Sequence, residues 1–404
     1  MRYTIGELAE IIDGDRGKNY PQQHEFLDEG YCLFLNTGNV TSSGFSFESN
    51  QYISKEKCDL LRKGKLQRRD IVYTTRGTVG NAAFYGDTVP YDHIRINSGM
   101  VIIRPNEDVV CTEFLYQILK SDYYRPYFKK YCTGSAQPQL PINNFSTIEL
   151  DLPALGIQWK IADILCSYDD LIENNQKQIK LLEEAAQRLY KEWFVDLRFP
   201  GYETTPIIDG IPEGWRLSTV GECSALLRRG ISPKYNEEGA SIVINQKCIR
   251  QSVVDIGEAR RQEKSFSLEM NLNDSDTVIC STGAGTLGRV GQMFGEHPNT
   301  TFDSHVTLVR AGDVVGKQYL YQFLKSKQQY FQGMGKGSTN QLELSRSTIQ
   351  ELPIFVPSSM ICKAFEQQTQ PIHDKITMLS NQIVLLCEAR DVLLPKLMNG
   401  EIEV

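Results

Sequence analysis

The sequence contains two copies of one pattern, and this duplication constrains the fold more than any other feature. Thr4–Glu7 returns as Thr219–Glu222, and Gly77–Gly80 returns as Gly285–Gly288. Further segments repeat in the same order: Leu115–Ser121 with Leu320–Ser326, Ser146–Ile148 with Ser347–Ile349, and Gln178–Ala185 with Gln382–Ala389. Matches that keep their order along a chain are typical of a repeated structural unit. We therefore expect an internal pseudo-two-fold repeat.

Each copy begins with a mixed part and ends with a long helix. Short apolar runs such as 70–74 and 100–103 alternate with Gly, Asn and Pro clusters, which predicts strands and loops. One amphipathic helix is expected over 112–120, and its counterpart over 317–325. The predicted fold class is α+β, with two mixed α/β domains separated by two long antiparallel coiled-coil helices. The predicted segments are residues 1–155, 156–199, 200–357 and 358–404.

The two long helices share a coiled-coil pattern. Positions that alternate by four and three residues run from Ile161 to Trp193, and the same register runs from Phe365 to Leu397. A helix over 161–193 is about 50 Å long, which suits a spacer. The residues expected in helix packing are Ile161, Leu165, Ile172, Asn175, Ile179, Leu182, Leu189, Ile376, Leu379, Ile383, Leu386 and Leu393.

Two polar residues, Asn175 and Arg390, occupy positions on these seams. Polar seam residues cost stability but can fix the register and the partner of a helix. The alternative is that each lies at a partly exposed edge of the seam. The sequence leaves both interpretations open.

No catalytic motif is recognisable. Residues 283–288 spell GxGxxG, but 289–295 alternates like a strand, whereas a dinucleotide site needs a helix there. We therefore expect a tight hairpin turn. The chain has no GxxxxGK[ST], GxSxG or HExxH motif, no CxxC pair, and no Asn/Asp-Pro-Pro-aromatic tetrapeptide of amino-methyltransferases. We assign no catalytic residue and no metal ligand, and we expect no cofactor in this chain.

Charge and cysteine usage bear on partners and location. The formal net charge is −7, and none of the four predicted segments is basic overall, which argues against DNA binding by bulk charge. The 10 cysteines are scattered, as expected for reduced thiols. The first residues form no apolar signal region, and no apolar run is long enough to span a membrane. We expect a cytoplasmic protein.

Basic residues nevertheless gather locally. Clusters occur at 62–69, 125–131 and 228–234, and such clusters can contact phosphates, although each can equally be a solvated surface. Two polar loops, 133–139 and 336–341, match between the copies and carry side chains that can bind base edges or form ordinary turns. The candidate DNA-binding residues are Thr75, Arg76, Arg125, Lys129, Ser135, Gln137, Gln139, Arg228, Arg229, Lys234, Thr282, Arg289, Lys336, Ser338, Asn340 and Gln341.

With these features, the whole chain resembles the specificity (S) subunit of type I restriction–modification systems. The similarity is strongest in Gln158–Leu165 with Asp169–Asn175, and in the ending Leu393–Ile402. The Gly-Ser-x-Gln loop before Leu152 is also similar. At the start of the second long helix, 359–363 lacks the Glu-Gln usual in the family.

The resemblance implies two target-recognition domains, each of which reads half of a split double-stranded DNA sequence in the major groove. The helices would set the gap and dock two methyltransferase (modification) subunits that bind S-adenosylmethionine and methylate adenine. Separate restriction/translocase subunits would use ATP and Mg²⁺ to move along DNA and cut it. The chain would thus be a non-catalytic subunit of a defence system against foreign DNA. We expect half-sites about one DNA turn apart, and base contacts from Gln139 and Gln341 or their neighbours.

Two other interpretations remain. The chain could be the recognition fragment of a fused restriction and methyltransferase enzyme, but such an enzyme needs cofactor and catalytic motifs. It could also be a coiled-coil scaffold that binds no DNA, but a scaffold does not need two divergent, loop-rich domains. Co-purification with a methyltransferase subunit distinguishes these interpretations.

Overall fold

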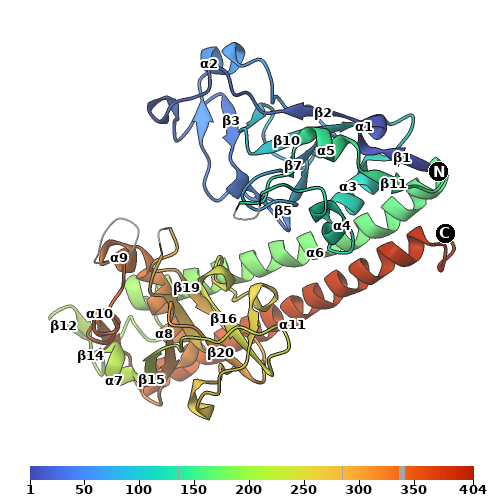
Figure 1. Cartoon of the computed structure of the whole chain (residues 1–404). Helices are drawn as coiled ribbons and strands as arrows, with labels where there is room; N and C mark the ends of the chain where they lie inside the picture. The colour runs from blue at the N-terminus through green and yellow to red at the C-terminus, as the bar shows by residue number, and fades with distance from the viewer. Residues whose placement is uncertain (135–136, 284, 336–341) are drawn as a thin grey trace. The chain divides into compact units, whose positions relative to one another are not determined.

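A computed structural model describes residues 1–134, 137–283, 285–335 and 342–404. The chain divides into two compact units, Met1–Glu173 with Val384–Val404, and Asn174–Ile383. Each unit contains one mixed part and one end of both long helices (Figure 1). Each hydrophobic cluster lies within a single unit, so each unit has a core of its own.

The first unit is built on two sheets. An antiparallel sheet has the order β2-β10-β7-β8, with strands Ala9–Asp13, Met100–Pro105, Ile71–Thr74 and Ala82–Phe84. A second sheet has the order β6-β3-β9, with strands Tyr52–Ile53, Cys32–Leu35 and Ile94–Ile96, of which β3 and β9 are parallel. The shorter strand pairs are β1 (Arg2–Thr4) with β11 (Glu149–Asp151) and β4 (Val40–Thr41) with β5 (Gly44–Phe45). The short helices are α1 (Ile5–Leu8), α2 (Lys55–Leu60), α3 (Thr112–Lys120), α4 (Arg125–Lys129) and α5 (Ile142–Ser146).

The second unit repeats this plan. Its antiparallel sheet has the order β15-β21-β18-β19, with strands Ser224–Arg229, Val306–Ala311, Thr277–Cys280 and Val290–Gln292. Its second sheet has the order β17-β16-β20, with strands Arg260–Gln262, Ser241–Ile244 and Thr300–Phe302, of which β16 and β20 are parallel. The remaining strand pairs are β14 (Arg216–Thr219) with β22 (Pro353–Val356) and β12 (Ile207–Ile208) with β13 (Ile211–Pro212). The short helices are α7 (Val220–Cys223), α8 (Lys317–Ser326), α9 (Gln328–Gly333) and α10 (Arg346–Gln350).

The expected duplication is therefore confirmed at the level of topology. The two four-stranded sheets have corresponding strand orders, and each three-stranded sheet contains one parallel pair. The expected helices over 112–120 and 317–325 are α3 and α8. The expected strands over 70–74 and 100–103 are β7 and β10, and residues 71–74 and 100–103 are fully buried.

The repeated Thr-x-Gly-Glu motif has a local physical cause. In α1, the Thr4 hydroxyl accepts from Glu7 N at 3.3 Å, and the Glu7 carboxylate accepts from Thr4 N at 2.7 Å. In α7, the Thr219 hydroxyl caps Glu222 N in the same way. Such caps satisfy amide groups that have no partner within the helix. The motif thus starts the equivalent short helix in each unit.

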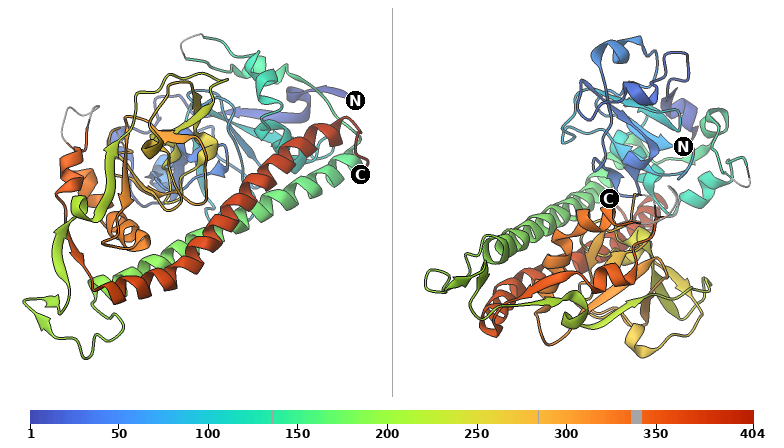
Figure 2. Two further views of the ribbon diagram at one scale, coloured as in Figure 1. Left: turned by 90° about the horizontal axis from the view of Figure 1, so that it is seen from below. Right: turned by 90° about the vertical axis from the view of Figure 1, so that its left-hand side faces the viewer.

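The two long helices are α6 (Leu155–Tyr190), which continues into a π-helical turn (Lys191–Val195), and α11 (Ser359–Met398). Within each unit, the segments of α6 and α11 lie side by side (Figures 1 and 2). Ile161 and Leu165 pack in one core with Leu394 and Leu397. In the second unit, Tyr190 and Trp193 share a core with Ile361 and Phe365. Later residues of α6 thus meet earlier residues of α11, so the pairing is antiparallel as expected.

Burial confirms the seam. None of the alternating positions from Ile161 to Trp193, or from Phe365 to Leu397, is exposed. Asn175 is buried and donates to Gln382 Oε1 at 3.4 Å. Arg390 is largely buried and donates to Asp169 Oδ1 at 2.8 Å. Both polar residues therefore make contacts between the helices instead of lying at an exposed edge.

Candidate nucleic-acid interface

In the first unit, the polar loop 133–139 lies beside the end of strand β7. Thr75 N donates to Gly99 O at 2.9 Å, and Leu140 N donates to Thr75 O at 3.0 Å. Arg76 and Gln139 face each other as an antiparallel bridge. Gln139 also exchanges two backbone hydrogen bonds with Thr133, at 2.7 and 2.9 Å, which closes the loop on itself. Two candidates far apart in sequence, Arg76 and Gln139, are thus neighbours.

The side chains at this place differ in accessibility. Gln137 is exposed, whereas Arg76 and Gln139 are half-buried. Thr75 is buried, and its hydroxyl donates to Gly99 O at 3.1 Å. The Thr75 side chain is therefore occupied in holding the backbone, and we leave it out of the proposed DNA-contacting set. Ser135 lies outside the described residues.

The second unit has the same backbone arrangement. Ser281 N donates to His305 O at 2.8 Å, and Leu344 N donates to Ser281 O at 2.9 Å. Thr282 and Glu343 form the antiparallel bridge that corresponds to Arg76 and Gln139. The candidates Lys336, Ser338, Asn340 and Gln341 lie outside the described residues.

The Gly-Thr-x-Gly turns next to these places are hairpin turns. Strands β18 and β19 on either side of 281–289 pair antiparallel, as do β7 and β8 in the first unit. Gly77 and Gly285 have φ values of 72° and 78°, a region that favours glycine. Because a strand follows the turn where a dinucleotide site needs a helix, the expectation of a hairpin is confirmed.

Several predicted basic contacts are ion-paired within the chain. Arg228 pairs with Glu269, and Lys234 pairs with Glu263. Arg229 pairs with Glu343, while Arg125 pairs with Asp122 at 2.8 Å. A phosphate would have to compete with these carboxylates for the same donors. The basic clusters are therefore weaker anion sites than the sequence alone indicates.

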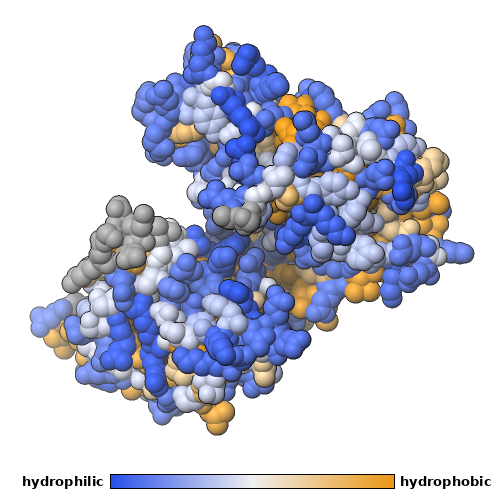
Figure 3. Space-filling model, viewed as in Figure 1, coloured by the Kyte–Doolittle hydropathy of each residue, from blue (hydrophilic) through white to orange (hydrophobic). Residues whose placement is uncertain are grey.

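Other basic candidates have no such partner. Among the described residues, none forms an ion pair with Arg76, Lys129 or Arg289. Lys129 is exposed, and Arg76 and Arg289 are half-buried. Figure 3 shows hydrophilic residues over much of the face of each unit that it draws. These three residues are the basic candidates best placed to meet phosphates or base edges.

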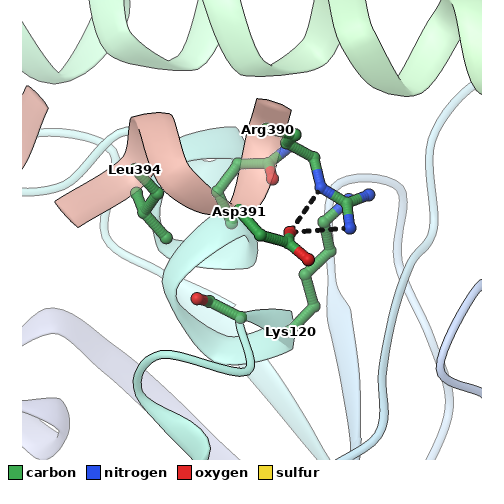
Figure 4. Close-up of a pocket in the computed structure, with 6 residues that line it drawn as sticks. Lys120, Arg390, Asp391 and Leu394 are labelled. Atoms are coloured by element: carbon green, nitrogen blue, oxygen red, sulfur yellow. Dashed lines mark hydrogen bonds and ion pairs between the residues drawn. The ribbon is translucent and has the colours of Figure 1, made fainter. Parts of the chain in front are cut away.

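In the first unit, a largely buried polar cluster connects the mixed part to both long helices. Asp169 on α6 accepts from Lys120 on α3, from Gln117 at 2.6 Å, and from Arg390 on α11 at 2.8 Å. Asp391 also pairs with Arg390, at 2.9 Å. Figure 4 shows Lys120, Arg390 and Asp391 around the small pocket that they line with Leu394.

In the second unit, different residues make the equivalent connection. Lys325 on α8, the repeat partner of Lys120, pairs with Glu183 on α6 at 3.8 Å. His373 on α11 contacts Asp274 at 2.9 Å, and its other ring nitrogen lies 3.0 Å from Gln318 Nε2. The Asp274 carboxylate has a pKa well below its ordinary value: burial raises it, but the contacts with His373 and Gly295 N outweigh burial. Both units thus anchor their mixed part on the long helices through buried polar side chains.

The ten cysteines all lie in the described ranges, and all are free thiols, as expected. Within the described ranges there is also no group of three or more His, Cys, Asp or Glu side chains that could hold a metal ion. No described helix is long and apolar enough to cross a membrane.

The sequence-based prediction missed three residues at the two loop sites. Gly99, His305 and Glu343 share these sites with predicted residues. No repeated motif marks them, because Gly99 and His305 occupy equivalent backbone positions with different side chains. Only the hydrogen-bond pattern of the strands identifies them.

Comparison with known proteins gives consistent results. Residues 1–184 match the model of the type I restriction modification DNA specificity domain. The HindI type I restriction enzyme specificity subunit of Haemophilus influenzae is 25% identical over 474 residues, which cover 98% of this chain and 100% of that protein. The MjaIX type I restriction enzyme specificity subunit of Methanocaldococcus jannaschii is 27% identical over 343 residues, which cover 83% of this chain and 78% of that protein.

A solved structure supports the fold. The crystal structure of a type I restriction-modification system S subunit from M. genitalium aligns with a TM-score of 0.51 at 17% identity. The alignment covers 98% of this chain and 96% of that chain. The similarity therefore extends over both copies of the repeat.

Proposed function

Because the chain belongs to the family of type I restriction–modification specificity subunits, we propose that it directs a DNA-modifying complex to a split target sequence. The observation that carries this proposal is the duplicated loop site. Each unit places a loop residue beside the end of a central strand, with the same backbone hydrogen bonds but different side chains. Two sites with the same backbone arrangement but different side chains are suited to recognise two different half-sites.

The contacts divide into two kinds. Arg76, Gln137 and Gln139 suit base edges in one half-site, since arginine can bind guanine and glutamine can bind adenine in two-point contacts. Lys129 suits a phosphate, which positions the protein without reading sequence. In the second unit, Arg289 and the Thr282 site are the corresponding candidates. Gln341 remains a candidate whose position is not described.

The chain itself is the non-catalytic part of this complex. We propose that two methyltransferase subunits dock on α6 and α11 and that separate restriction/translocase subunits join them in the cytoplasm. S-adenosylmethionine, ATP and Mg²⁺ would then be bound by those partners. The net charge of −7 is consistent with this division, because it does not favour DNA binding by bulk charge. The chain would bind DNA through local contacts, and the partner subunits would add further affinity.

The proposal is tested by sequencing methylated adenines in cells with and without this gene. Loss of the gene should abolish methylation at one split sequence, and re-expression should restore it. The tagged chain should also co-purify with a methyltransferase subunit. An unchanged methylation pattern in the deleted strain would refute the proposed function.

A further inference from the structure

The loop sites of the two units can be aligned through their backbone hydrogen bonds alone. Thr75 N to Gly99 O corresponds to Ser281 N to His305 O. Leu140 N to Thr75 O corresponds to Leu344 N to Ser281 O, and the bridge at Arg76 corresponds to the bridge at Thr282. Gly99 and His305 therefore occupy the same position of the repeat.

The two units carry different side chains at these equivalent positions. The first unit carries Arg76 on one segment and no side chain at Gly99 opposite it. The second unit carries the short Thr282 on the first segment and the imidazole of His305 on the other. At these two positions, each unit thus presents one nitrogen-bearing side chain, Arg76 or His305, and the two come from opposite segments.

The imidazole of His305 is exposed but held in place. Its Nδ1 lies 2.6 Å from the Thr282 hydroxyl. Its backbone N donates to the buried Asp303 carboxylate at 2.9 Å, and its carbonyl accepts from Ser281 N at 2.8 Å. Arg229 donates to the neighbouring Ser304 O at 2.7 Å while it pairs with Glu343. Among the described residues, Nε2 of His305 has no hydrogen-bond partner, and the residue is exposed, so this nitrogen can bind another molecule.

We propose that His305 is a specificity-determining residue of the second unit and contacts a base edge in its half-site. This inference rests on the proposed function. In the tautomer in which the Thr282 hydroxyl donates to Nδ1, Nε2 carries the proton and suits a major-groove acceptor, which guanine, adenine and thymine offer. In the other neutral tautomer, Nε2 accepts and suits the amino group of adenine or cytosine. Thr282 and Arg229 are positioning residues in this arrangement. Arg229 serves to neutralise Glu343 and hold the turn, instead of contacting a phosphate.

The test uses the complete complex of this chain with its methyltransferase subunits. Methylation rates are measured on the target and on DNAs with each single base change in both half-sites. His305→Ala should reduce discrimination severalfold to about tenfold at one position of one half-site, as expected for the loss of a single hydrogen bond. Thr282→Val, which removes the orienting hydroxyl, should reduce discrimination at the same position. His297→Ala, which changes a histidine of the same unit bonded to Phe294 O, should retain the original pattern.

The outcomes are separable. Loss at one position, with the other half-site and the melting temperature unchanged, supports the proposal. Unchanged discrimination at every position in His305→Ala would refute it while leaving the proposed function intact. Equal losses in both half-sites would also refute it, because they indicate general damage. Absence of any sequence preference in the unmodified complex would instead refute the proposed function.

Discussion

At the scale of single residues, the contacts of Asp169 give this carboxylate a stabilising role that the sequence does not indicate. Burial by itself raises the pKa of Asp169, but Lys120, Gln117 and Arg390 stabilise the carboxylate more, so its pKa lies below the ordinary value. The folded state therefore binds this proton less readily than the unfolded chain does. The resulting stabilisation is present above the pKa of the unfolded chain and is lost as the pH falls.

Replacement of Asp169 with Asn should leave Lys120 without its partner and lower the stability of the first unit. We expect a loss of about 3 kcal/mol, at the lower end for buried pairs because a quarter of the Asp169 side chain is exposed. The difference should begin to shrink as the pH falls below about 4, because the unfolded chain binds the proton there before the folded protein does. Urea unfolding at several pH values measures it. Asp170→Asn, at the exposed next position, is the control; an equal loss there would contradict the assignment.

Lys129 allows a different test, because it is exposed and unpaired among the described residues. Lys129→Gln should weaken DNA binding by the complex equally for all sequences. The slope of log affinity against log salt should become shallower by about one unit, since one phosphate contact is lost. Fluorescence anisotropy over a salt series measures this slope. Lys375→Gln, on α11, should leave the slope unchanged. A change in base preference would show instead that Lys129 reads sequence.

At the scale of elements, side chains of the long helices bind backbone amides at the start of the short amphipathic helices α3 and α8. Glu366 on α11 accepts from Gln318 N and Tyr319 N, at 3.0 and 3.1 Å, in the first turn of α8. Gly316 permits this approach, because a Cβ there would lie 2.1 Å from Glu366 Oε1. In the first unit, Gln158 on α6 accepts from Cys111 N at 3.0 Å. The first turn of α8 is thus capped by a side chain from α11, and the residue that precedes α3 is held by a side chain from α6.

Burial raises the pKa of Glu366, so its charged form costs stability at neutral pH even though its oxygen caps α8. Glu366→Ala should lose the cap and about 1 kcal/mol of stability. Glu366→Gln keeps an acceptor oxygen without the buried charge and should be at least as stable as the native protein at pH 7. Thermal melts compare these with Gln367→Ala, an exposed neighbour. Equal losses in both Glu366 variants would show that the charge, and not the acceptor, stabilises the helix.

At the scale of the whole molecule, both long helices run through the boundary between the units. The boundary lies between Glu173 and Asn174 on α6 and between Ile383 and Val384 on α11. Under the proposed function, four residues inserted at both points should lengthen the spacing of the half-sites and leave both half-site sequences unchanged. The added length is roughly 6 Å, or about two base pairs. Sequencing of methylated sites measures the spacing.

A control for this experiment is a four-residue insertion after Thr204, in an exposed connection of the second unit. It should leave the spacing unchanged. Unchanged spacing after the helix insertions, with methylation retained, would show that the helices do not set the gap.

The sequence predicts local features of the chain more accurately than contacts between segments that are distant in sequence. Helix α3 covers the expected residues Thr112–Lys120, and every seam position is at least half-buried. Arg76 and Gln139, which the sequence predicts separately from their chemistry, are neighbours in the structure. The sequence does not predict the ion pairs of Arg228, Arg229 and Lys234. Each joins residues from separate segments, whose proximity depends on strand register.

The duplication, the two long helices and the lack of a recognisable catalytic motif can all be read from the order of the residues along the chain. These features depend on order along the chain and on periodicities of three to four residues, which a linear sequence displays directly. By contrast, the equivalence of His305 and Gly99, and the ion pair of Arg229 with Glu343, are visible only once the strands are paired. Cross-strand neighbours are set by pairing register and loop closure, and these join residues that no local pattern connects.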